Sequence, residues 1–180
     1  MILDIRRISI GSQAGAKARI DTAGPVEALA PAALGGTQVF QIWGTDSTPV
    51  VGPGEQELSF DPYFPEPGGI RYVLVTMPPQ DAPPPAAEVD PQDALAEVER
   101  LFPGVMAAMT PDEQGLHRTD TVDINLILDG ELWLELDDGT ETRLTPGYCV
   151  VQRGASHAWH NRGDRPALMA SVLIGARRSA

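Results

Sequence analysis

Polar and hydrophobic residues alternate with the two-residue period of β-strands in the second half of the chain. From Thr121 to Leu128, one face carries Asp123, Asn125 and Ile127, and the other carries aliphatic residues only. Turns rich in Gly follow at short intervals, at 129–130, 137–139, 146–147 and 153–154. Short strands separated by such turns are typical of an antiparallel barrel or sandwich.

The strand at 121–128 has two interpretations. Either its aliphatic face is the core and its polar face meets water, or both faces are covered. In the second case, another sheet or subunit covers the aliphatic face, and the polar face lines a small barrel interior that holds a site. Periodicity alone leaves both interpretations open.

Similar patterns predict strands in the first half, at 2–10, 17–22, 37–43 and 71–77. A change of apolar phase near Arg6 and Arg7 indicates a bulge there. The stretches 23–35 and 44–69 are rich in Gly, Pro or Ala and are expected to be loops. We expect residues 1–77 to form an N-terminal sheet that completes the barrel.

Residues 78–110 predict a Pro-rich linker followed by a helix. Asp90 is a suitable N-cap and Pro91 suits the first helical position. One apolar stripe combines Ala94, Leu95, Val98, Leu101 and Phe102, and the helix ends at Pro103–Gly104. Residues 105–109 can add another turn. We expect this segment to pack outside the barrel, either as a surface helix over apolar strand faces or as a lid over the barrel mouth.

Residues 167–174 form a strand that is apolar on nearly every position, so both of its faces need cover. Together with the aliphatic face of 121–128, this pattern predicts a homodimer in which sheets pack across subunits.

Composition narrows the class of protein. A chain of 180 residues with 42% hydrophobic content predicts a single domain, 1–180. A net charge of −12 makes nucleic acid an unsuitable partner. No apolar run approaches the roughly 20 residues of a membrane span, and the N-terminal residues do not resemble a secretory signal. The single Cys149 predicts a reducing, cytoplasmic setting and an inert buried thiol.

The three histidines, His117, His157 and His160, all lie between residues 117 and 161. His117, Asp123 and Gly130 have the spacing of the first His, the acid and the final Gly of a motif with the form His-x-His, three or four residues, Glu, six residues, Gly. Asp stands in place of Glu, and Thr119 stands where the second His belongs.

A second group of residues fits the pattern Gly, five residues, Pro-x-Gly, two residues, His, three residues, Asn. The matching residues are Gly147, Gly154, His157 and Asn161, with one residue fewer after the first Gly and Gln152 in place of Pro. Together the two motifs, which cover about a third of the chain, resemble the cupin superfamily. The resemblance implies an all-β cupin jelly roll, or double-stranded β-barrel, with a short helical insertion before a motif region at 111–176.

The resemblance also implies a metal site at His117, Asp123 and His157. Two imidazoles and one carboxylate suit a divalent ion such as Fe(II), Mn, Ni or Zn. Thr119 would leave one coordination position open for water or substrate. The alternative is a metal-free cupin in which His117 and Asp123 hydrogen-bond each other.

Neighbouring residues would complete a substrate pocket. Asn125 shares a face with Asp123 and can orient a ligand, so both are candidate catalytic residues, while Thr119, Ile127 and Trp159 are candidate pocket residues. His160 points away from His157 and is expected at the surface or an interface. Asp120 is either a general base or an exposed residue before the strand.

Three functions are compatible with this site. The first is a metal-dependent, non-redox enzyme, such as a dehydratase, isomerase or decarboxylase, that acts on a carbonyl- or hydroxyl-bearing small molecule, aromatic or polyketide-like. The second is an Fe(II)-dependent dioxygenase, and the third is a metal-free ligand-binding module without catalysis. No helix-turn-helix pattern supports a transcription factor.

Overall fold

The computed structural model describes residues 4–12, 17–52, 57–83, 90–110 and 115–179. Its strands are β1 (Arg6–Ser12), β2 (Ala18–Pro25), β3 (Ala28–Leu29), β4 (Gln38–Thr45), β5 (Ile70–Met77), β6 (Thr121–Asp129), β7 (Leu132–Leu136), β8 (Glu141–Leu144), β9 (Cys149–Arg153), β10 (His157–His160) and β11 (Ala167–Gly175). The helices are η1 (Ala32–Leu34), α1 (Pro91–Leu101) and α2 (Val105–Ala108).

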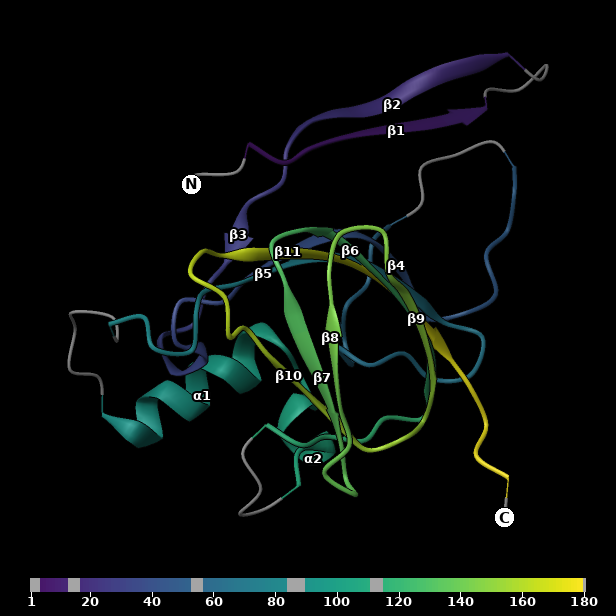
Figure 1. Cartoon of the computed structure of the whole chain (residues 1–180). Coiled ribbons are helices and arrows are strands. Elements are labelled where there is room, and N and C mark those ends of the chain that lie inside the picture. Colours follow the sequence, from purple (N-terminus) through teal and green to yellow (C-terminus); the bar gives the residue numbers. More distant parts are fainter. Residues whose placement is uncertain (1–3, 13–16, 53–56, 84–89, 111–114, 180) are drawn as a thin grey trace.

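Two antiparallel sheets enclose the interior of the molecule (Figure 1). The larger sheet has the strand order β3-β4-β5-β11-β6-β9, and the smaller sheet has the order β10-β7-β8. The described helices are short, and α1 and α2 come directly before the segment that leads to His117. The predicted all-β class with a helical insertion is therefore confirmed.

Strand β6 lies between β11 and β9, and its side chains alternate between the two faces of the larger sheet. Thr121, Asp123, Asn125 and Ile127 are buried on the inner face, whereas Ile124, Leu126 and Leu128 are exposed on the outer face. The turn after β6 requires Gly130, whose φ is 73°. A Cβ on Gly130 would lie 2.6 Å from the Ala167 Cα atom, so only Gly lets β6 turn this close to β11.

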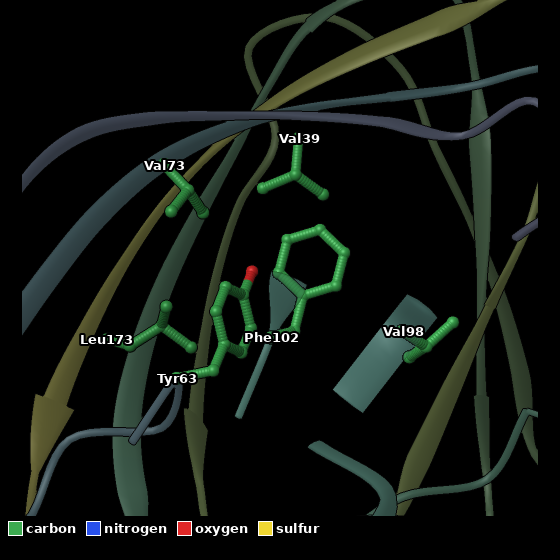
Figure 2. Packing of buried hydrophobic residues seen from close by; sticks show 6 residues of the cluster. All are labelled: Val39, Tyr63, Val73, Val98, Phe102 and Leu173. Atoms are coloured by element: carbon green, nitrogen blue, oxygen red, sulfur yellow. The ribbon is translucent and has the colours of Figure 1, made fainter. Parts of the chain in front are cut away.

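Helix α1 packs on the inner side of the larger sheet, not outside the barrel as the sequence predicted. Asp90 caps it by accepting a hydrogen bond from the Gln92 backbone N–H at 2.8 Å. Val98 and Phe102 pack in one cluster with inner-face residues of β4, β5 and β11 and with Tyr63 (Figure 2). The edge-on Tyr63 and Phe102 rings lie 5.1 Å apart, and together they close this end of the interior with apolar surface.

Strands β1 and β2 form a separate two-stranded sheet instead of completing the barrel (Figure 1). Only β3, β4 and β5 of the N-terminal half join the larger sheet. The register shift in the hairpin falls between Ser9 and Ile10, not at Arg6–Arg7. Within the described part of the chain, Ile8, Ile10 and Ile20 remain exposed on this hairpin, so its apolar residues do not bury against the barrel.

The outer face of the larger sheet is aliphatic and exposed at several positions. Cys149 lies on this face and is exposed, which corrects the prediction of a buried thiol. The apolar outer face is the surface on which a homodimer was predicted, and the dimer stays a prediction, as do the single domain and the cytoplasmic setting. In the described residues, none of the helices is long and apolar enough to span a membrane.

Candidate functional site

His117 and His157 are cross-strand neighbours. Their backbones exchange two hydrogen bonds, from His117 N–H to His157 C=O at 3.0 Å and from His157 N–H to His117 C=O at 3.1 Å. Directly opposed residues in an antiparallel pair place their side chains on the same side. The two imidazole rings consequently lie with centroids 4.2 Å apart, although 39 residues separate them in the sequence.

Both imidazoles use Nδ1 for a hydrogen bond to the backbone. The partners are Gly115 C=O, 3.0 Å from His117 Nδ1, and Ala155 C=O, 2.9 Å from His157 Nδ1. Since a carbonyl oxygen only accepts, Nδ1 carries the proton in each ring, and Nε2 keeps its lone pair. Such bonds also fix the orientation of each ring.

Burial and mutual proximity keep both rings neutral. Burial lowers the pKa of His157 to about 4, and the neighbouring His117 contributes further to this shift. Burial also lowers the pKa of His117, against a smaller raising effect of its bond to Gly115. Two imidazole bases are therefore available at neutral pH.

Asp123 is a buried carboxylate on the inner face of β6. Burial raises its pKa from 3.8 to about 6, and a hydrogen bond from the Thr121 side chain opposes this shift. Its Oδ1 atom has no hydrogen-bond partner in the structure. A carboxyl group with such a pKa can change protonation state near neutral pH.

The two histidines and Asp123 line one cavity of about 150 Å³ between the sheets. Of the predicted catalytic and pocket residues, Asn125 and Trp159 also line it. The Trp159 ring stands edge-on to His157 at a centroid distance of 6.0 Å. The remaining lining is mostly apolar: Tyr63, Phe64, Val73, Val75, Met77, Met169 and Leu173, with the polar residues Gln152 and Ser171.

Thr119 and Ile127, two predicted pocket residues, lie elsewhere. Thr119 is hydrogen-bonded to Thr121 at 2.7 Å between hydroxyl oxygens, and it lines a different, larger hollow of about 840 Å³. Ile127 is packed in a second apolar core cluster with Leu132 and Leu144. Ile127 lies on the inner face of β6, as the alternation predicted. It is at the end of the strand where apolar side chains fill the interior, so it does not reach the cavity.

His160, which was expected at the surface or an interface, and the general-base candidate Asp120 both pair with charged side chains. His160 Nε2 lies 2.7 Å from Glu135 Oε2, away from the cavity, as expected from the alternation along β10. Asp120 is exposed and accepts a hydrogen bond from Arg178 Nε at 2.6 Å. Neither lines the cavity that holds His117 and His157.

Three cavity residues that carry polar side-chain groups were not predicted. Tyr63 comes from the irregular stretch 44–69, and burial raises the pKa of its hydroxyl, with a further contribution from nearby Asp123. Gln152 and Ser171 are each a polar residue inside an otherwise apolar strand stretch. That isolation was a usable signal, because a buried polar residue is more informative than an exposed apolar one.

The predicted metal ligands are gathered only in part. The free Nε2 atoms and the unpaired Asp123 Oδ1 are suitable donors for a divalent ion. Across the parts of the chain that the structure describes, however, no group of three His, Cys, Asp or Glu residues is close enough to hold a metal ion. The residues do not fit a preformed three-ligand centre, and metal binding remains a prediction.

No protein-family model matches this sequence. Over a stretch of 50 residues, the chain is 46% identical to the phomopsin biosynthesis cluster protein D of Diaporthe leptostromiformis. This match covers 28% of this chain and 26% of that protein. Over 65 residues the chain is 34% identical to the cupin-domain-containing oxidoreductase virC of Hypocrea virens, a match that covers 34% of each chain. Together with the two sequence motifs, this similarity supports the cupin superfamily.

The matched part of the chain spans between about a quarter and a third of the length of these curated relatives. Among solved structures, it is similar to a cupin domain of an XRE family transcriptional regulator from Enterobacter cloacae, with a TM-score of 0.37 and 17% identity over 60% of this chain and 83% of that chain.

Proposed function

We propose that this cupin is a small-molecule biosynthetic enzyme that catalyses non-redox proton transfer next to a carbonyl group, as an isomerase, dehydratase or decarboxylase does. One observation carries the proposal: two imidazole Nε2 lone pairs and an unpaired carboxylate oxygen share a buried, largely apolar cavity. The relatives named as biosynthesis cluster proteins support a role in making a small molecule.

The protein groups suit this chemistry by their protonation states. A neutral His157 or His117 can take a proton from the carbon beside the carbonyl, because its Nε2 lone pair is free. Asp123, with a pKa of about 6, can exchange a proton with a substrate oxygen. Return of the proton to another carbon of the enolate completes an isomerisation. In a dehydration, the hydroxyl on the β-carbon leaves as water with a proton from Asp123, and a carbon–carbon double bond forms.

The cavity limits which part of a substrate reacts there. Its volume of about 150 Å³ is below the roughly 300–1,000 Å³ of sites that hold drug-sized ligands. An aromatic or polyketide-like substrate would therefore insert only its reacting end, against the walls formed by Trp159, Tyr63 and Met169.

A divalent metal, Fe(II), Mn, Ni or Zn, is a separate part of the proposal. His117 and His157 are the residues that would hold it, with Asp123 as the third candidate. When bound, such an ion would polarise a substrate carbonyl or hydroxyl. The proton transfers described above use the side chains of the chain itself and do not require the ion.

A second candidate function is an Fe(II)-dependent dioxygenase or other oxidoreductase. It is favoured by three relatives that are named cupin-domain-containing oxidoreductases. This function requires oxygen consumption coupled to substrate loss, whereas proton transfer does not. A non-catalytic ligand-binding cupin, favoured by Thr119 at the position of the second motif His, requires no turnover at all.

Solvent exchange tests the leading proposal without knowledge of the natural substrate. Cyclohexanone is incubated in D₂O with the protein, and loss of its α-proton signal is followed by NMR. We expect exchange faster than in buffer, and a fall of about 10²- to 10⁴-fold when both bases are removed in His117→Ala/His157→Ala. His160→Ala is the matched control and should exchange like the wild type. Exchange no faster than in buffer would refute the proposal.

The same samples separate the alternatives. Elemental analysis of the wild type, His157→Ala and His160→Ala shows whether a metal depends on the paired imidazoles. An oxygen electrode shows whether any turnover consumes oxygen. Metal content that is equal in all three proteins would remove His157 as a ligand.

A further inference from the structure

Three side chains that line the cavity each bury a polar atom with no hydrogen-bond partner. These atoms are Asp123 Oδ1, Gln152 Nε2 and Ser171 Oγ. The three residues are 5%, 7% and 4% exposed, respectively, so bulk water does not satisfy these atoms. They therefore form an unpartnered polar wall in a cavity whose other lining is mostly apolar apart from His117, His157 and Asn125.

Strand register brings the three residues of this polar wall together. Asp123 on β6 is the direct cross-strand partner of Gln152 on β9. On the other side of β6, Asn125 is the partner of Ser171 on β11. Because these positions all face inward, the wall runs across three adjacent strands, β9, β6 and β11.

Asn125 orients the donor of this wall. Its Nδ2 atom donates a 2.8 Å hydrogen bond to Gln152 Oε1. The acceptor end of the Gln152 amide is thereby occupied, while the Nε2 donor end is left without a partner. Gln152 also stands where the second cupin motif has Pro, so this donor is a feature of this chain and not of the motif.

A buried donor or acceptor without a partner destabilises the folded protein, and three adjacent ones are uncommon unless a ligand satisfies them. The wall offers a fixed N–H donor, a hydroxyl that can donate, and a carboxylate oxygen that accepts. No Lys or Arg is among the residues that line this cavity in the described chain. An anionic ligand would meet Asp123 without a compensating cation.

We propose that the polar wall of Asp123, Gln152 and Ser171 is a recognition subsite for an uncharged α-hydroxy ketone. The ketone oxygen accepts hydrogen bonds from Gln152 Nε2 and Ser171 Oγ, and the neighbouring hydroxyl donates to Asp123 Oδ1. This inference rests on the proposed function for the location of the reacting group, and it specifies the substrate class. The α-carbon that bears the hydroxyl would then face the side of the cavity that holds His117 and His157.

Binding of matched small probes tests the subsite. The probes are 2-hydroxycyclohexanone, cyclohexanone and cyclohexanecarboxylate, titrated into the protein while the Trp159 indole signal is followed by NMR. We expect the hydroxyketone to bind about tenfold more tightly than cyclohexanone, the equivalent of one hydrogen bond of about 1.4 kcal/mol. The carboxylate should bind most weakly. Equal affinity for the hydroxyketone and cyclohexanone would overturn the proposal.

Variants assign the effect to the wall. Ser171→Ala removes one donor with little change in volume, and Gln152→Met removes the Nε2 donor together with the Oε1 acceptor of the Asn125 hydrogen bond. Each variant should weaken hydroxyketone binding by about five- to tenfold. Ser9→Ala and Gln92→Met make the same changes on β1 and α1 at positions that do not line the cavity, and should bind like the wild type. Thermal unfolding confirms that each variant is folded. Folded Ser171→Ala and Gln152→Met proteins with wild-type affinity would contradict the subsite.

The subsite and the proposed function can fail separately. If the wild type prefers the hydroxyketone but does not accelerate α-proton exchange, the subsite stands and the enzymatic proposal fails. If α-proton exchange is catalysed while the Gln152 and Ser171 variants keep full affinity for the hydroxyketone, the enzymatic proposal stands and the subsite fails.

Discussion

The two faces of β6 reverse the usual arrangement of a half-buried strand. Its inner face buries Thr121, Asp123 and Asn125, while its outer face exposes Ile124, Leu126 and Leu128. In most antiparallel sheets the apolar face is inside and the polar face is outside. A buried polar face requires partners for its hydrogen bonds, and an exposed aliphatic face requires cover. The comparison is the basis of two proposals for β6: ligand binding on its inner face and association with a second chain on its outer face.

The largest expected effect separates adjacent residues on the two faces. Ile127 is 1% exposed and Leu128 is 42% exposed. Ile127→Ala should lower the free energy of unfolding by about 2–5 kcal/mol, because it leaves a cavity in the inner core. Leu128→Ala should cost about 1 kcal/mol or less in the monomer. Urea denaturation measures both, and equal losses would show that the outer face is as tightly packed as the inner core.

The pH dependence of the free energy of unfolding is a second test of the inner face. It is measured in protein treated with EDTA, so that no bound metal affects the result. Asp123 has a pKa of about 6 in the folded protein against 3.8 when unperturbed, so the folded state holds this proton more tightly. Stability from this group is present below about pH 4 and is lost as pH rises through 6, by about 3 kcal/mol in total. Relative to the wild type, Asp123→Asn should therefore become more stable between pH 4 and 7.

His157 should act with the opposite sign in nearly the same range. Its pKa of about 4 lies below the ordinary 6.5, so its contribution is present above pH 6.5 and is lost as pH falls through 4. Relative to the wild type, His157→Gln should gain stability on acidification from pH 7 to 4. Urea denaturation at several pH values measures both variants. Parallel profiles for wild type and variants would show that these groups are not perturbed by burial.

A substitution on the outer face should have a small effect on the stability of the fold and a larger effect on the association of two chains. We expect the wild type to sediment with twice the 19.2 kDa mass of one chain, and Leu126→Glu to sediment as a monomer. A charge on the aliphatic face cannot be buried between two sheets without a large cost. Thr142→Glu, on the exposed side of β8, is the control and should stay dimeric. A monomeric wild type would leave the aliphatic face without its predicted partner.

Much of this comparison was predictable from the sequence, for identifiable reasons. The alternation in 121–128 is strict, so the two faces of β6 could be assigned, and the motif spacing indicated that His117 and His157 converge. Alternation does not predict which residues of other strands lie beside each face of β6. That Asp123 stands beside Gln152 depends on the register of β6 with β9, which is set by strands far apart in the sequence.

Other features depend on tertiary packing that leaves little trace in the sequence. Tyr63 reaches the cavity from an irregular segment that has no periodicity to interpret. Helix α1 has an apolar stripe, but a stripe shows that a helix is covered and not which side of a sheet covers it. The alternating pattern of β1 and β2 predicted strands correctly, yet it could not show that they form a hairpin apart from the barrel.

The ring nitrogens of His117 and His157 provide the most direct test that the inner face is a reactive site. Long-range ¹H–¹⁵N NMR at pH 7 distinguishes the neutral tautomers from each other and from imidazolium, without and with 2-hydroxycyclohexanone. We predict that both rings are neutral, with the proton on Nδ1, and that the Nε2 signals shift when the probe binds. Rings that are charged or protonated on Nε2, or Nε2 signals that ignore the probe, would contradict a site built on two free imidazole bases.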